Sequence, residues 1–273
     1  MRRNPRPLPP TDEPSPLDRT WSGSRRRAES LRLPSVPTLV VAPHPDDETL
    51  MAGGLIALQR ARAVDVHVLA VTDGEAAYDA AGSRELAAGR RVEQMDALEE
   101  LGVGPDSVTR LGIPDGAAAD HVSEIVDAIA AFDHVGLVVA PWTGDYHCDH
   151  EAVGAAARAA VARTGSALIF GLFWTWHRRT PADLADERML ELQLDADAWH
   201  RRQRAIQCHR SQFVHEDGAP QLTPELVRPI GWQAEYFISP HLLANPSADP
   251  ASNETWLATG VPPVTSGPSG VET

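Results

Sequence analysis

The 273-residue sequence has no lysine and only two cysteines, Cys148 and Cys208. Two cysteines are too few for a disulfide scaffold in a chain of this length, which favours a reducing compartment. No apolar run approaches the roughly 20 residues of a membrane-spanning helix, and no hydrophobic stretch follows the N-terminal arginines as it would in a secretory signal. We therefore expect a cytoplasmic protein without a membrane span.

Positive charge is scarce as well. All 24 basic residues are arginines, 38 residues are acidic, and the formal net charge is −14. Eight of the arginines fall within residues 1–35, so the rest of the chain is even more acidic. Binding to nucleic acid needs a positive face that displaces counterions, and the charge therefore argues against a nucleic-acid partner. The hydrophobic share of 42% is sufficient for a globular core.

Proline and small polar residues mark both ends of the chain. We expect residues 1–35 to form a disordered arm rich in proline and arginine, and residues 244–273 to form a disordered tail. Residues 36–243 have the size of one domain and contain no internal repeat. Nothing in the sequence indicates an oligomeric state.

Within residues 36–243, short β-branched segments alternate with longer amphipathic ones. This alternation predicts a single α/β domain with a Rossmann-like, mostly parallel sheet flanked by helices. The expected strands are residues 38–42, 64–72, 108–112, 135–141 and 167–174. The expected helices are residues 50–62, 84–101, 123–132, 151–163 and 199–209. Binding sites of such sheets lie in loops at the carboxyl ends of the strands.

The first polar cluster follows the expected strand 38–42. His44 stands between two prolines and is followed by Asp46, Asp47 and Glu48. Adjacent carboxylates repel one another unless a cation offsets their charge, and a divalent metal would do so. The alternative is an acidic first helical turn without any metal, which the helix dipole favours.

The second polar cluster, His147, Asp149 and His150, follows the expected strand 135–141. The two histidines are three positions apart and project from one helical turn, a usual spacing for metal ligands. The alternative is a pair of surface histidines at a helix start. Together the two clusters supply the mixed histidine and carboxylate set that zinc accepts, with a fourth position for water.

These motifs resemble those of the PIG-L and LmbE-like de-N-acetylases. Residues 43–48 with Gly53-Gly54 are similar to the family's Ala-His-Pro-Asp-Asp-Glu loop, and residues 147–150 are similar to its His-x-Asp-His turn. Pro43 replaces the usual alanine, and Cys148 replaces the usual proline. Further segments that match the family are Thr72–Glu75, Arg90–Glu93, Leu101–Val103, Leu111–Gly116, His209–Gln212 and Glu235–Phe237.

The resemblance implies a metal-dependent hydrolase that removes the acetyl group from an N-acetylated amino sugar and releases acetate. The substrate would be a small N-acetylglucosaminyl compound or glycoconjugate. The implied metal ligands are His44, Asp47 and His150, holding one Zn²⁺ per chain, although Fe²⁺ or another divalent metal accepts the same ligands.

The resemblance also implies roles for Asp46, His147 and Arg90, and the place of Asp149 beside His147 suggests a fourth. Asp46 would be the general base and His147 would face the oxyanion. Asp149, beside His147, would hold that imidazole in a suitable tautomer. Arg90 would approach the substrate, the alternative being an ordinary ion-paired arginine on a helix face.

Two other functions remain open from the sequence. One is an amidase that acts on a larger N-acyl group of a thiol conjugate or a natural-product intermediate. The other is a metal-binding module without catalysis. The aromatic segment 170–176 is expected to continue a buried strand, and a tryptophan near its end could stack on a sugar ring.

Overall fold

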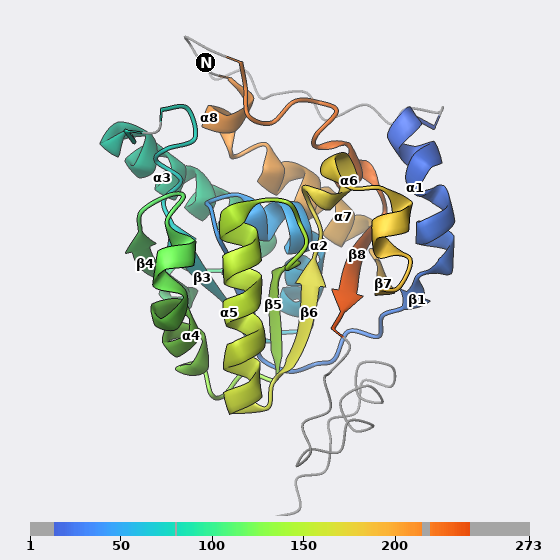
Figure 1. Ribbon diagram of the computed structural model, residues 1–273, viewed down its shortest axis with the longest axis horizontal. Coiled ribbons are helices and arrows are strands. Elements are labelled where there is room, and N and C mark those ends of the chain that lie inside the picture. Colours follow the sequence, from blue (N-terminus) through green and yellow to red (C-terminus); the bar gives the residue numbers. More distant parts are fainter. Residues whose placement is uncertain (1–13, 80, 215–218, 241–273) are drawn as a thin grey trace, which may run out of the picture.

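The computed structural model describes residues 14–79, 81–214 and 219–240, which form an eight-stranded sheet (Figure 1). The strand order is β1-β7-β8-β6-β5-β2-β3-β4. All neighbouring strands are parallel except β8, which is antiparallel to β6 and β7. The expected mostly parallel α/β sheet is therefore confirmed. The strands are β1 (Glu29–Ser30), β2 (Thr38–Ala42), β3 (Val66–Thr72), β4 (Val108–Ile113), β5 (Leu137–Pro141), β6 (Ala167–Gly171), β7 (Arg188–Gln193) and β8 (Ala234–Ser239).

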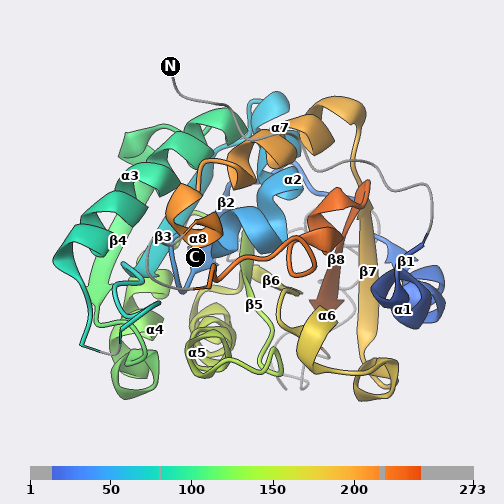
Figure 2. The ribbon, with the colours of Figure 1, turned by 90° about the horizontal axis from the view of Figure 1, so that it is seen from above.

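Helices cover both faces of the sheet (Figure 2). α2, α3 and α7 bury one face, whereas α4 and α5 bury the other and α1 packs near the β1 edge. Every residue of the central strands β2 and β5 is buried, as expected for parallel strands covered on both sides. The helices are α1 (Pro16–Arg27), α2 (Asp47–Ala61), α3 (Arg84–Leu101), α4 (Val122–Ala130), α5 (Cys148–Thr164), α6 (Thr175–Arg178), α7 (Ala196–Ile206) and α8 (Arg210–Phe213). Short 3₁₀ turns are η1 (Pro105–Ser107), η2 (Ala118–His121), η3 (Pro181–Leu184) and η4 (Arg228–Gly231).

The expected strand 167–174 is too long. The strand β6 ends at Gly171, and the chain turns into the short helix α6. The carboxylate of Asp145 causes this turn, since it accepts hydrogen bonds from the backbone N–H groups of residues 173–175. The expected continuation of the buried strand through residue 176 is therefore wrong.

The expected disordered arm is wrong for residues 16–27, which form helix α1. Its N-terminus has a capping box between Ser15 and Asp18. Trp21 is fully buried, and its Nε1 donates a 2.9 Å hydrogen bond to the carbonyl oxygen of Trp176. Partial burial opposes the ionisation of Asp18, but hydrogen bonds from Ser15, Trp232 and Arg228 outweigh it and hold the pKa of Asp18 well below its ordinary value.

Both ends of the chain extend beyond the described residues. The expected tail 244–273 and residues 1–13 of the expected arm lie outside them. The proposed limits 36–243 of a single catalytic domain stay a prediction. In the part of the chain that the structure describes, no helix combines the length and the apolar character that crossing a membrane requires.

Candidate active site

Loops at the carboxyl ends of β2, β3, β4, β5 and β6 surround one pocket of about 420 Å³. This is the edge of the sheet at which parallel α/β folds bind ligands. Of the site residues that the resemblance implies, His150 alone is absent from the pocket wall, because it is buried behind Asp47. The residues that line the pocket include His44, Asp46, Asp47, Arg90, Asp115, His147, Asp149 and Trp174.

His44, Asp47 and His150 come together as a group that can bind a metal ion. Their ligand atoms all lie within 4.8 Å of one another. Asp47 is the centre of the group: Oδ2 lies 3.0 Å from Nδ1 of His44, and Oδ1 lies 3.2 Å from Nε2 of His150. The Nε2 atom of His150 is buried, and its contact with Asp47 lacks the geometry of a hydrogen bond. A buried imidazole nitrogen that makes no hydrogen bond, and that faces a carboxylate and a second imidazole, is suited to bind a divalent cation.

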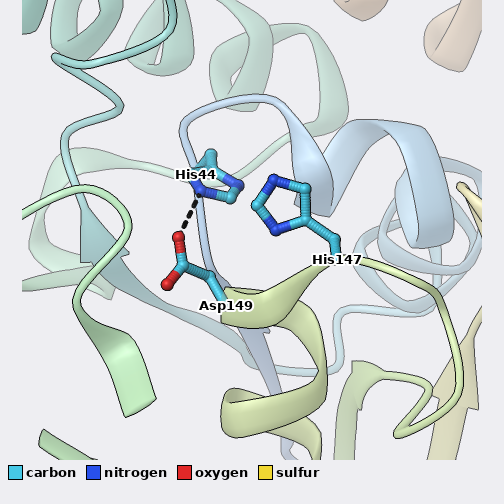
Figure 3. A group of neighbouring side chains, drawn as sticks. All are labelled: His44, His147 and Asp149. Carbon is cyan, nitrogen blue, oxygen red and sulfur yellow. Dashed lines mark hydrogen bonds and ion pairs between the residues drawn. The ribbon is translucent and has the colours of Figure 1, made fainter. Parts of the chain in front are cut away.

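A second possible ligand group shares His44. The ligand atoms of His44, His147 and Asp149 also lie within 4.8 Å of one another. Figure 3 shows His147 and Asp149 extending from the start of α5 toward His44, which belongs to the loop after β2. Oδ2 of Asp149 lies 3.1 Å from Nε2 of His44. Carboxylate oxygens that could bind a cation therefore lie on both sides of the His44 ring.

Asp145 fixes the orientation of His150. Its Oδ2 lies 2.8 Å from Nδ1 of His150, and the residue has no exposure to solvent. Burial alone lowers the pKa of His150, but the charge of Asp47 and the hydrogen bond to Asp145 outweigh burial and raise this pKa to about 9. The carboxylates thus make the position beside His150 favourable for positive charge.

Asp46 points into the pocket beside the buried guanidinium of Arg90. Nη2 of Arg90 lies 3.2 Å from Oδ1 of Asp46, and Nη1 donates to the carbonyl oxygen of Gly74. Burial raises the pKa of Asp46, although the charge of Arg90 opposes this rise. Arg90 therefore contacts the carboxylate of Asp46 as well as lining the pocket.

His147 lies between the other two histidines and Trp174. Burial, together with the nearby imidazoles of His150 and His44, lowers the pKa of His147 to about 4. Its ring is stacked with Trp174 at a centroid distance of 6.2 Å. Its Nδ1 atom has no hydrogen-bond partner. A neutral imidazole whose Nδ1 has no hydrogen-bond partner can form a hydrogen bond with a bound ligand.

The expected pairing of Asp149 with His147 is wrong. Asp149 instead lies against His44 and accepts hydrogen bonds from the backbone N–H groups of Gly116 and Ala118. The physical reason is direction: at the start of α5, side chains two positions apart point to different sides of the helix, so Asp149 faces the loop after β4.

Sequence reasoning missed Asp115 and Asp145. Oδ1 of Asp115 lies 3.1 Å from Nε2 of His44, and in the sequence Asp115 belongs to the turn Leu111–Gly116. The signal was available, because Asp115 follows the expected strand 108–112, at the carboxyl end where site residues gather. Asp145 stands two residues before His147, in a loop that belongs to neither polar motif.

Comparisons with known proteins find similarity to deacetylases over part of the chain. Residues 39–161 match the PIG-L family, described as GlcNAc-PI de-N-acetylase. A 1D-myo-inositol 2-acetamido-2-deoxy-alpha-D-glucopyranoside deacetylase of Rhodococcus opacus (strain B4) is 43% identical over 75 residues, covering 24% of this chain and 26% of that protein. A probable N-acetyl-alpha-D-glucosaminyl L-malate deacetylase 2 of Bacillus subtilis (strain 168) is 31% identical over 139 residues, covering 46% of this chain and 60% of that protein. The chain thus matches less than two thirds of the length of either curated relative.

A solved structure has the same fold over a greater length. The crystal structure of the conserved protein TT1542 from Thermus thermophilus aligns with a TM-score of 0.58 and 28% sequence identity. The alignment covers 78% of this chain and 99% of that chain. The sheet and its flanking helices are therefore common to both proteins.

Proposed function

We propose that this chain, whose residues 39–161 match the PIG-L family of de-N-acetylases, hydrolyses the acetamide group of an N-acetylated amino sugar. The products are acetate and the free amine. One observation carries the proposal: the ligand atoms of His44, Asp47 and His150 lie within 4.8 Å of one another, and the carboxylate of Asp46 lies beside them on the pocket wall. A bound metal ion beside a free carboxylate is an arrangement that supports hydrolysis of an amide.

We propose His44, Asp47 and His150 as the ligands of one Zn²⁺ ion per chain. Two imidazoles and one carboxylate, with further positions open to the pocket, are a usual set for catalytic zinc. Fe²⁺ and other divalent metals accept the same ligands, so the native metal follows from an elemental measurement. When bound, the ion supplies a Lewis acid that polarises the amide carbonyl and makes water more acidic.

The remaining steps belong to the side chains of the chain itself. Asp46 accepts the proton of the attacking water, and Arg90 holds its carboxylate in place. As the new C–O bond forms, His147 donates a hydrogen bond to the developing oxyanion. The C–N bond then breaks, and the proton held by Asp46 passes to the departing amine. Asp149 supports this arrangement through His44.

The proposed substrate is a small N-acetylglucosaminyl compound or glycoconjugate. Both curated relatives carry names of deacetylases that act on glucosaminyl compounds, one an inositol glycoside and the other a malate glycoside. Trp174 lines the pocket beside His147, and the part of its ring that His147 and Arg178 leave open would contact a sugar. Arg90 and Gln212 add polar groups to the wall. Contact of Arg90 with the substrate and a cytoplasmic location stay predictions.

A second candidate is hydrolysis of a larger N-acyl group. Leu50, Phe173 and Leu222 form an apolar part of the pocket wall, which an acyl chain would contact. A metal-binding module without catalysis is the third reading, and the carboxylate of Asp46 beside the metal group argues against it.

Elemental mass spectrometry and acetate release test the proposal together. We expect about one metal ion per wild-type chain and its loss in a His44→Ala, His150→Ala double variant. His67→Ala with His134→Ala is the matched control, since this pair lies in ring contact on β3 and before β5, away from the pocket. The control should keep its metal. Wild-type chain without metal after incubation with zinc would refute the proposal.

Activity assays with the same purified protein identify the substrate class. We expect acetate release from a panel of N-acetylglucosaminides, with loss of turnover when a chelator is added and recovery when metal is restored. Turnover restricted to larger N-acyl groups would support the second candidate. Metal binding without turnover on any amide would support the binding module.

A further inference from the structure

Helix α2, which begins with Asp47, is interrupted after its first turn. Ala52 has φ −148° and ψ 15°, so two helical segments meet there at a kink. In an unbroken helix, the N–H of Gly54 would donate to the carbonyl oxygen of Leu50. The N–H of Leu55 would donate to the carbonyl oxygen of Met51 in the same way. A kink inside a buried helix needs other partners for these groups, because unpaired backbone groups are costly away from water.

A buried ion pair from two other elements supplies partners on both sides of the kink. Glu235 of β8 accepts hydrogen bonds from the N–H of Gly54 at 2.6 Å and the N–H of Leu55 at 2.8 Å. Arg202 of α7 donates through Nη2 to the carbonyl oxygen of Leu50 at 3.0 Å. Nε of Arg202 lies 3.0 Å from Oε1 of Glu235, and both side chains are at most 4% exposed. The pair thus takes the place of a missing turn of helix hydrogen bonding.

Gly53 and Gly54 make room for this pair. A Cβ atom at residue 53 would lie 3.1 Å from Cγ of Arg202. A Cβ atom at residue 54 would lie 2.5 Å from Cδ1 of Leu194 and 3.0 Å from Oε1 of Glu235. The two glycines near the first polar motif therefore allow a charged pair to reach the backbone of the helix that carries the motif.

Stability alone does not account for such a pair. Burying two charges carries a desolvation cost, and apolar residues of similar size often serve stability equally well. Here each charged group binds backbone atoms that only a kinked α2 exposes. The first turn, whose direction depends on the kink, carries Asp47 and Leu50, and both lie on the pocket wall.

We propose that Arg202 and Glu235 are positioning residues, which hold the kink in α2 and so direct Asp46 and Asp47 toward the pocket and His150. The effect of these residues on metal affinity rests on the proposed function. Their effect on the backbone of α2 does not, because it concerns hydrogen bonds that exist without metal.

Two variants test the inference. Glu235→Gln keeps the shape of the side chain but offers one acceptor oxygen to two backbone N–H groups. Arg202→Lys keeps a positive charge but lacks the forked head that reaches Glu235 and the carbonyl oxygen of Leu50 together. The matched control is Asp18→Asn, which removes a partly buried charge from the contact between α1 and Arg228 without touching α2.

Three measurements report on the variants. In metal-free protein, NMR should show hydrogen exchange at Gly54 or Leu55 at least about tenfold faster in Glu235→Gln, because one of the two amides loses its acceptor. The imidazole signals of His150 should move in both variants, since Asp47 shifts beside this ring. Metal affinity, measured by competition with a chelator, should fall about tenfold or more, as it does when groups that support metal ligands are removed. The control should match the wild type in all three.

The outcomes separate the inference from the proposed function. Wild-type exchange rates, His150 signals and metal affinity in both variants would overturn the inference. Loss of stability like that of Asp18→Asn, with unchanged metal affinity, would also overturn it, as would failure of both variants to fold. A wild-type chain that binds no metal would refute the proposed function, while the exchange rates and the His150 signals would still decide what the pair does to α2.

Discussion

Replacement of Asp145 by asparagine tests whether this residue orients His150, one of the proposed metal ligands. The buried carboxylate contacts Nδ1 of His150 at 2.8 Å, and its other oxygen accepts from the N–H and hydroxyl of Thr175 at 2.7 and 2.6 Å. An amide has one oxygen and one NH₂ group. In either orientation, the NH₂ group faces a donor, so either His150 or Thr175 loses its acceptor.

The size of the effect follows from these contacts. A hydrogen bond to a charged group contributes about 1.5–3 kcal/mol, and a buried donor left without a partner costs about 1–3 kcal/mol. We therefore expect Asp145→Asn to lower the free energy of unfolding by about 2–4 kcal/mol. Groups that orient a metal-binding histidine typically change metal affinity by about 10–100-fold, and we expect a loss in that range.

The assay combines denaturant unfolding with metal competition against a chelator. Thr175→Val is the matched control, because it removes a hydroxyl donor from the same carboxylate and leaves the contact with His150 in place. The control should lose about 1 kcal/mol of stability and keep its metal affinity within about twofold. Equal metal affinity in Asp145→Asn and wild type would refute the role of Asp145 as the group that orients His150.

Three other predictions concern the pocket and helix α1. Asp46→Ala should keep its metal and lose about 10²–10⁴-fold in kcat, whereas Asp47→Ala should lose metal; equal metal loss by elemental analysis would contradict these roles. Trp21→Ala should lower the free energy of unfolding by about 3–5 kcal/mol in urea titrations, against no change for exposed Arg26→Ala, and equal midpoints would contradict the packing of α1. Because the folded pKa of Asp18 is depressed, its stabilising effect should be complete above the ordinary pKa of 3.8 and decline as pH falls further. Unfolding of wild type and Asp18→Asn from neutral to acid pH measures this, and a difference that grows in acid would contradict the sign.

Much of the fold was predictable because its strongest signals are local. The segment 38–42 is rich in β-branched and apolar residues, and the helix 84–101 has a serine cap and a glycine at its end. β7 was missed because charged residues interrupt its apolar positions, and its pairing partner β8 lies far along the chain. α1 was missed because proline and arginine dominate its surroundings, although Trp21 is held by tertiary contacts that no local pattern reports.

The residues of the candidate site that belong to short sequence motifs could be predicted. His44 and Asp47 come from one loop and His150 from another, and the rule for the carboxyl ends of parallel strands brings the two loops together. The partners of these residues were harder to foresee. The contact between Asp149 and His44 and the position of Asp115 depend on how the loop after β4 lies over α5, which is set by packing between distant segments.

The position of β8 has a consequence for the order in which the protein matures. β8 is the last described strand of the chain, yet it lies inside the sheet between β6 and β7. Pairing between distant segments forms late in folding, because loop closure must come first. During synthesis the motif residues His44, Asp47 and His150 emerge well before Glu235, which binds the backbone of α2. A nascent chain can therefore display the ligand motifs before it can orient them, and we expect tight metal uptake only after β8 has left the ribosome.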